Sequence, residues 1–240
     1  MKKSSLYSKL FIGGLSISFL VACSSNQTTS SSSQSVSEGN NFAFVQKANE
    51  NVENIWYVIE DSNDDYQLSK DDKIETVYLT KNGKMDVYHV GSLPGEEPLT
   101  LSFLKDKSNS EIKELVRQSA EAHFSEILEY NSLSTKISID DLLNRPVKAT
   151  VETDSTGNTV VEETIRYATF DLDSDKNVVP DESYNIFNST ISGYIYDTYY
   201  VGYAGNAGST SRSIFLVISA PNENVSISFD TLDTENVSEE

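Results

Sequence analysis

The sequence predicts an α+β fold rich in β-structure: antiparallel sheets in a sandwich- or barrel-like arrangement, with one long packed helix over about residues 109–130. Two observations predict this class. About nine or ten runs of β-branched and aromatic residues are joined by connections of hairpin length, which favours antiparallel pairing. One stretch changes to the helical spacing of apolar residues, and such a helix must bury its apolar face against the sheets.

The part of the chain before this helix is expected to hold four strands. The first is "NIWYVIED" (54–61), which is β-branched and aromatic. Asn82-Gly83 separates the next two runs, a signature of a type I′ hairpin that places Val77 opposite Tyr88 and Leu79 opposite Asp86. Both faces of this hairpin carry apolar residues, so we expect both to be covered. "PLTLSFL" (Pro98–Leu104) is expected to be the fourth strand.

The helix is predicted by apolar residues that recur at i, i+3 and i+4 from Ile112 to Leu128. Ser108, followed three residues later by Glu111, forms a plausible capping box at its start. A short second helix is expected in "SIDDLLNRP" (138–146), capped by Ser138 and Asp141 and ended by Pro146.

From Val147 the chain is β-rich again. "RSIFLVIS" (212–219) is continuously apolar, which predicts a central strand covered on both faces. "VSISFD" (225–230) alternates, with Val225, Ile227 and Phe229 inward. We expect one globular domain over 49–230, with a division into two subdomains near 131–146 left open, and a disordered acidic tail over 231–240.

The N-terminus has the pattern of a secretory signal over residues 1–22. Three lysines precede an apolar stretch of roughly a dozen residues, which is short for a membrane span of about 20. It ends in Leu20-Val21-Ala22-Cys23, which resembles the lipobox of bacterial lipoproteins. That resemblance implies diacylglycerol on the Cys23 sulfur and cleavage before Cys23, and hence a lipid anchor on the extracytoplasmic face of the cell membrane.

Residues 23–48 are expected to form a flexible tether, because Ser, Thr, Asn and Gln dominate the segment after Cys23. The short charged start and the Ser-rich tether resemble lipoproteins of low-GC Gram-positive bacteria. Removing the signal takes away three lysines and leaves 15 basic and 37 acidic residues, a net charge of −22. Such a charge repels nucleic acid, so we exclude nucleic acid as a partner.

An acidic stretch, "DLDSDKNVVPDE", has the spacing of a calcium loop. Its ligands would be Asp171, Asp173, Asp175, Asn177 and, as the closing bidentate residue, Glu182. Lys176 stands where the turn favours glycine, and the flanks have the character of strands. A solvated acidic loop is the alternative interpretation.

Tyrosines gather in "GYIYDTYYVGYAGNAG" (193–208). Their rings could contact a partner protein or stack on sugars, or they could pack within the sheet. The candidate partner surface consists of Tyr194, Tyr196, Tyr199, Tyr200 and Tyr203.

No catalytic motif is recognised, so no catalytic residue is assigned. The two histidines form no zinc motif, and His123 lies on the apolar stripe of the helix, which predicts a packed core histidine. No serine lies in a G-x-S-x-G frame. Carboxylate pairs could act on sugars, but 37 acidic residues make coincidental pairs certain.

The whole layout resembles a group of uncharacterised surface lipoproteins of streptococci, enterococci and lactobacilli. The resemblance rests on the lipobox, "IWY", "SKDDKIETVYLTKNGKMDVYHV", "LTLSFLKDKSNSEIKELV" and "IYDTYYVGY". It implies no catalytic or binding residue, because no activity is assigned to that group.

These observations predict a lipid-anchored, non-catalytic module without a cofactor that binds an unknown extracellular protein or glycan. A Ca²⁺-binding or Ca²⁺-stabilised module is the first alternative, and a cell-envelope glycan hydrolase is the second.

Overall fold

The computed structural model describes residues 41–240 apart from 64, 92–96, 132, 134, 136 and 176. The expected signal peptide, the lipidated Cys23 and the tether as far as residue 40 lie outside the described residues. Within the described part of the chain, no helix combines the length and the apolar composition that a membrane span requires.

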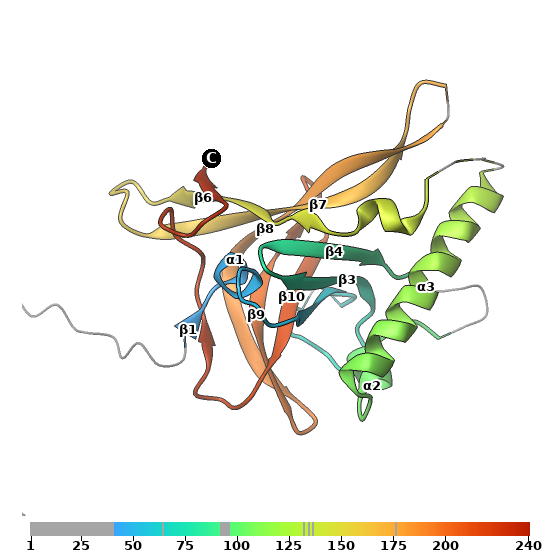
Figure 1. The fold of residues 1–240 in the computed structure, drawn as a ribbon. Coiled ribbons are helices and arrows are strands. Elements are labelled where there is room, and N and C mark those ends of the chain that lie inside the picture. The colour runs from blue at the N-terminus through green and yellow to red at the C-terminus, as the bar shows by residue number, and fades with distance from the viewer. Residues whose placement is uncertain are drawn as a thin grey trace, which may run out of the picture. The chain divides into compact units, whose positions relative to one another are not determined.

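The described chain forms a ten-stranded, mostly antiparallel sheet, curled into a half-barrel, with one helix of 22 residues packed on it (Figure 1). This confirms the expected β-rich antiparallel class. The strand order is β12-β6-β7-β8-β9-β10-β2-β3-β4-β5. The strands are β2 (Asn54–Glu60), β3 (Ile74–Lys81), β4 (Lys84–His89), β5 (Arg145–Pro146), β6 (Lys148–Thr153), β7 (Val160–Leu172), β8 (Val178–Ile195), β9 (Thr198–Ala207), β10 (Ser213–Ala220) and β12 (Val237–Glu239).

The sheet curls because its two ends are almost continuous in the chain. β5 pairs with β4 at one end and β6 pairs with β7 near the other, yet only Val147 separates β5 from β6. Tyr78 on β3 and Asn185 on β8 lie four strands apart in the sheet order, yet their side chains are hydrogen-bonded at 3.2 Å across the concave face.

Side chains on the two faces of the sheet form separate cores. The concave core holds Trp56, Tyr78, Phe187 and Tyr203, together with Phe44 of α1 (Phe44–Ala48). The opposite core lies under α3 (Asn109–Tyr130) and includes Phe215 and Val217 of β10. β10 is buried on both faces, which confirms the prediction for its apolar run.

The local sequence signals for the hairpin and the long helix are confirmed. Asn82 and Gly83 have φ angles of 52° and 71°, as a type I′ turn requires, and β3 and β4 pair in the expected register. α3 spans the expected residues, and the backbone N–H of Ser108 donates to Glu111 Oε2 at 2.8 Å in a capping box.

Two expected elements differ. Pro98–Leu104 is not a strand: α2 (Leu101–Leu104) is a short helix, because the Thr100 hydroxyl accepts from the Phe103 N–H and the i, i+3 pair Leu101 and Leu104 is buried. The second helix is a single 3-10 turn, η1 (Ile139–Leu142), which ends before Pro146 because Arg145–Pro146 pairs with β4.

Both ends of the fold extend beyond the expected limits. β1 (Asn41–Phe42) pairs in parallel with β11 (Ser226–Ile227), and α1 lies in the concave core, so residues 41–48 belong to the domain rather than to the tether. The acidic tail, expected to be disordered, contains β12, which pairs in parallel with β6. Burial of Phe44 and Val45 explains why residues 41–48 fold with the domain.

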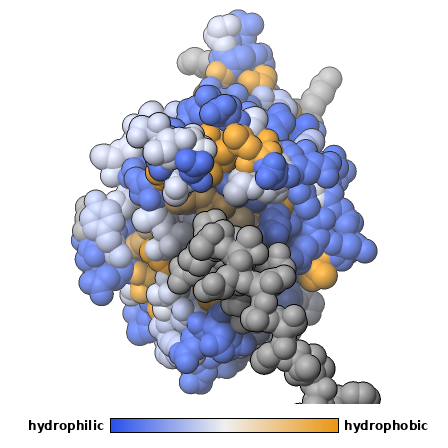
Figure 2. Space-filling view, turned by 90° about the vertical axis from the view of Figure 1, so that its left-hand side faces the viewer, coloured by the Kyte–Doolittle hydropathy of each residue, from blue (hydrophilic) through white to orange (hydrophobic). Residues whose placement is uncertain are grey.

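The side of the fold that carries β1 and β6 presents a mostly hydrophilic surface, with a smaller apolar group among the polar residues (Figure 2). This agrees with the acidic composition of the chain, in which 37 acidic residues outnumber 18 basic ones.

Candidate ligand-binding cavity

A cavity of about 560 Å³ lies between α3, β4 and β7. Its lining combines Val87 and Tyr167, which also touch the concave core, with Val90 and Phe124 from the core under α3. The cavity therefore lies on the open side of the half-barrel, between β4 near one end of the sheet and β7 near the other. Its volume is within the range of small-molecule sites, roughly 300–1,000 Å³.

Apolar and aromatic side chains form most of the wall. The rings of Phe124 on α3 and Phe170 on β7 contact each other with centroids 4.5 Å apart. Ile127 and Leu172 extend the apolar wall and are 40% and 43% exposed. A ligand with an apolar body would therefore replace water against most of this surface.

His89 supplies a partly buried imidazole to the lining. Its Nε2 lies 3.3 Å from the Ala168 carbonyl oxygen, which can only accept, so Nε2 carries the proton. Its Nδ1 then accepts from the Thr76 hydroxyl at 3.2 Å. Burial lowers the pKa of His89 to about 4, so the ring is neutral at pH 7 and bridges β4 to β7.

His123 lies on α3 and packs against the backbone that follows β4. Its Nδ1 is buried and has no hydrogen-bond partner among the described residues. A Cβ on Gly91 would lie 2.0 Å from this nitrogen, so only glycine leaves room for the ring. Burial lowers the pKa of His123. The sequence predicted a packed histidine, and the structure places it in the cavity wall.

Three charged residues line one part of the cavity. Arg212 Nη1 lies 2.6 Å from Glu75 Oε1, and Lys73 Nζ lies 4.0 Å from the same oxygen. Burial raises the pKa of Glu75, and the neighbouring Arg212 opposes that shift. With Asp171, which also lines the cavity, the wall presents two cations and two carboxylates that a polar ligand head could contact.

The residues of the expected calcium loop are not gathered around one point. Asp173 accepts from the backbone N–H groups of Asp175 and Asn177, which closes the turn between β7 and β8. Asp171 faces Val179 across the ladder, whereas Glu182 faces Ala168, roughly 10 Å further along the hairpin. The Glu182 carboxylate lies 3.5 Å from Lys148 and 3.7 Å from Arg166. Lys176 is outside the described residues.

The five tyrosines of the candidate surface separate into buried and exposed groups. Tyr203 is fully buried; its hydroxyl donates to the Ser228 carbonyl and accepts from the Phe44 N–H. Tyr199 and Tyr200 are partly buried. Tyr194 and Tyr196 are 55% and 44% exposed at the hairpin between β8 and β9. Only these last two offer much of their surface to a partner.

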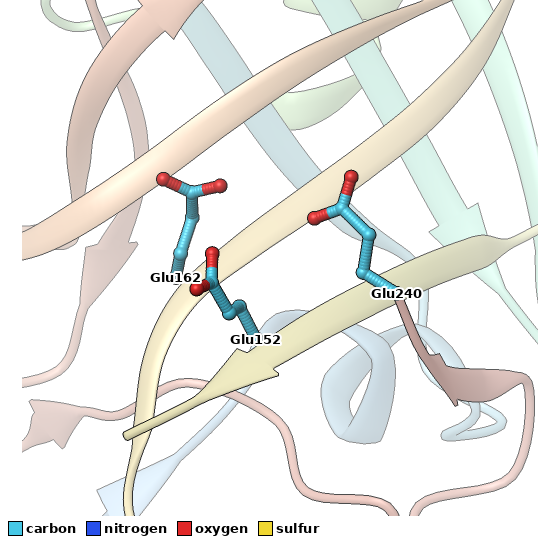
Figure 3. Close-up of side chains that lie close together, drawn as sticks. All are labelled: Glu152, Glu162 and Glu240. Atoms are coloured by element: carbon cyan, nitrogen blue, oxygen red, sulfur yellow. The ribbon is translucent and has the colours of Figure 1, made fainter. Parts of the chain in front are cut away.

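Three glutamates form an acidic cluster that sequence spacing did not reveal. Glu152 on β6 lies opposite Glu162 on β7, and Glu240 follows β12; a carboxylate oxygen from each lies within 4.8 Å of the others (Figure 3). Partial burial and the two neighbouring carboxylates raise the pKa of Glu162. A divalent cation held here would need water for its remaining ligands, since Ca²⁺ takes about 6–8 oxygens.

No family model matches this chain, no curated protein is significantly similar to it, and no solved structure matches it.

Proposed function

We propose that this protein is a lipid-anchored extracytoplasmic binding protein, whose folded domain takes up a small, mainly apolar ligand in the cavity between α3 and the curled sheet. The proposal joins two lines of argument. The lipobox ending in Cys23 predicts the anchor, and the cavity supports a binding role for the domain.

The observation that carries the binding role is the apolar lining of a cavity of about 560 Å³. Phe124, Phe170 and Leu172 border this cavity and leave apolar surface that a ligand would bury. Burial of apolar surface contributes roughly 25 cal/mol per Å² to the free energy of binding. Two polar groups of the lining, His89 and Glu75, are held by hydrogen bonds or an ion pair, as in sites that orient an apolar ligand.

The state of His89 favours binding over proton-transfer catalysis. Thr76 and His89 are hydrogen-bonded, as a nucleophile and its base would be, but the pKa of His89 is lowered to about 4 by burial. A base this weak takes little of the hydroxyl proton near pH 7. The bond to the Ala168 carbonyl also gives the ring a structural role between β4 and β7.

The binding role is tested with the fluorescent probe anilinonaphthalene sulfonate, an aromatic amphiphile. We expect saturable binding to the folded protein. Ile127→Trp should fill the mouth and weaken binding by about tenfold, which corresponds to roughly 1.4 kcal/mol. Val161→Trp is the matched control, since Val161 is 41% exposed, as Ile127 is at 40%, but lies outside the cavity lining. Probe binding that is absent, or equal in both variants, would contradict the proposed site.

The anchor is tested separately with Cys23→Ser. We expect this variant to be released from the membrane or to remain unprocessed, because sulfur is the lipid acceptor. Normal processing and membrane retention of the variant would contradict the anchor and leave the cavity experiment unaffected.

A further inference from the structure

The longest strand of the sheet, β8, has a partner on both sides over only part of its length. β7 pairs with β8 from Val178 to Phe187, and β9 pairs with β8 from Asn185 to Ile195. The register shifts between Phe187 and Ser189, where β7 and β8 diverge. Among the described strands, the stretch Ser189–Ile195 therefore has a hydrogen-bonded neighbour on one side only.

This stretch has the properties of an open edge strand. In an antiparallel ladder about half of the residues direct their N–H and C=O groups away from the partner strand. The side chains alternate: Thr190, Ser192 and Tyr194 are exposed, whereas Ile191 and Ile195 pack against the core under α3. The packed residues fix the strand, so its free edge keeps a defined register.

Another described stretch with one paired neighbour, Tyr167–Leu172 of β7, is covered, because His89 bonds to the Ala168 carbonyl and Phe124 of α3 packs on Phe170. β12 pairs along β6, and β5 continues into β6 at the opposite end. Proteins commonly protect an exposed edge with Lys, Pro or a covering segment. The sequence from Ser189 to Ile195 is "STISGYI", without charge or proline.

We propose that Ser189–Ile195 is a docking edge for a basic, extended peptide segment of another protein, which adds to the sheet as a further strand. Strand addition satisfies the free backbone groups, and the side chains beside the edge select the sequence. The edge shares no residue with the cavity lining, so the inference is independent of the proposed apolar ligand.

The charge around this edge is acidic. Asp65 and Asp197 are exposed and border two surface hollows that both include Tyr194, and the Tyr194 hydroxyl donates to Glu223 at 3.4 Å. Lys70 and Lys105 are nearby, but Lys70 is paired with Asp71, and Lys105 Nζ lies over the Tyr196 ring, 4.3 Å from its centroid. From residue 41 onward the chain has 36 acidic and 15 basic residues, which favours a basic segment over a second copy of this chain.

Two exposed aromatic rings flank the edge. Tyr66, 72% exposed, lines a hollow together with residues 190–195, and Tyr194 projects from the strand itself. Tyrosine faces attract Lys and Arg side chains within about 6 Å by cation–π interaction. Alternate basic side chains of an added strand would meet these rings.

The test is a selection of random peptides displayed on phage against the full-length protein in detergent micelles. We expect enrichment of peptides that alternate β-branched with Lys or Arg residues. A synthetic copy of an enriched peptide should slow amide hydrogen exchange within 189–195. The double variant Thr190→Lys with Ser192→Lys should weaken its binding by about tenfold or more, through like-charge repulsion at the edge.

Two controls separate strand addition from charge attraction alone. Ser155→Lys with Thr159→Lys adds the same charge at exposed positions in the turn between β6 and β7 and should leave binding unchanged. A peptide methylated at alternate backbone nitrogens keeps its charge but cannot pair, and should not bind. The proposal is overturned if no peptide discriminates the edge variant from the wild type, if the methylated peptide binds equally well, or if exchange at 189–195 slows with protein concentration alone, which would identify a second copy as the occupant.

Discussion

Glu163 and Asp230 bring two carboxyl groups together in the interior, where the backbone N–H of Asp230 donates to Glu163 Oε2 at 3.0 Å. The Asp230 carboxylate in turn accepts from the N–H groups of Val45 and Gln46 in α1, at 2.6 and 3.0 Å. Burial and the Asp230 charge raise the pKa of Glu163 well above its usual value. Burial raises the pKa of Asp230 as well, and its hydrogen bonds from Val45 and Gln46 oppose that shift, so Asp230 is the carboxyl group of the pair that holds α1 in the concave core. Tyr203 is the other titratable group beside the pair.

Glu163→Gln should stabilise the protein relative to the wild type, and this gain should increase as the pH rises. A carboxyl group with a raised folded-state pKa contributes stability at low pH and loses it as the pH rises above the unfolded value of 4.5. Glutamine stays neutral and avoids that loss, so between pH 5 and 8 the variant should gain at least about 1 kcal/mol relative to the wild type. Urea unfolding at several pH values measures the difference, and a gain that does not vary with pH would contradict it.

Asp230→Asn should destabilise the protein at every pH near neutral. The variant replaces charge-assisted bonds to two N–H groups of α1 with a weaker amide acceptor, at a cost of about 1–3 kcal/mol. Hydrogen exchange at Val45 and Gln46 should accelerate in the variant. Unchanged protection at both amides would show that α1 does not depend on this carboxylate.

His89 should make the protein less stable in acid. Its folded-state pKa of about 4 is lower than the unfolded value of 6.5, so its contribution is present above pH 6.5 and is lost as the pH falls towards 4. The full loss is about 3 kcal/mol. His89→Gln keeps a donor and an acceptor and should flatten this part of the pH profile. Titration of the His89 ring by NMR with a midpoint near 6.5 would contradict the buried, neutral state.

Gly91→Ala should disturb the cavity wall. The new Cβ would lie 2.0 Å from His123 Nδ1, and crowding of this kind costs about 1–3 kcal/mol. The ring must move, so binding of anilinonaphthalene sulfonate should also change. Gly193→Ala is the matched control, because a Cβ there meets nothing within 4 Å. Equal thermal stability of both variants would show that His123 moves without cost.

Glu162→Gln should slightly stabilise the protein by removing like-charge repulsion within the glutamate cluster. Opposed like charges on neighbouring strands cost about 0.5 kcal/mol, and the pKa of Glu162 is raised in part by Glu152 and Glu240. Calcium at millimolar concentration should raise the melting temperature of the wild type more than that of the variant. Equal shifts in the two proteins would locate any calcium effect outside the glutamate cluster.

The fold class and several local elements were predictable because their signals are contiguous in the sequence. Asn82-Gly83 fixes a hairpin by backbone conformation, and Ser108 with Glu111 begins α3 by mutual hydrogen bonds. The prediction of a strand at Pro98–Leu104 was wrong, because the Thr100 cap and two buried leucines outweigh β-propensity over so short a stretch.

The cavity was not predictable in the same way, since its lining comes from segments far apart in the chain. Sequence analysis identified His123 by its place on the helical stripe, but only packing against Gly91 places it beside the gap between β4 and β7. The open edge of β8 also depends on where β7 and β8 diverge, which is a property of the pairing and not of either strand alone.

The position of α1 decides where a protease could cut the chain without damaging the folded domain. Phe44 and Val45 are fully buried only a few residues after Asn41, the first described residue. A cut before Asn41 would free a domain with α1 and its contacts to Asp230 intact. A cut after Val45 would detach one wall of the concave core, and the released fragment would be a substrate for further degradation.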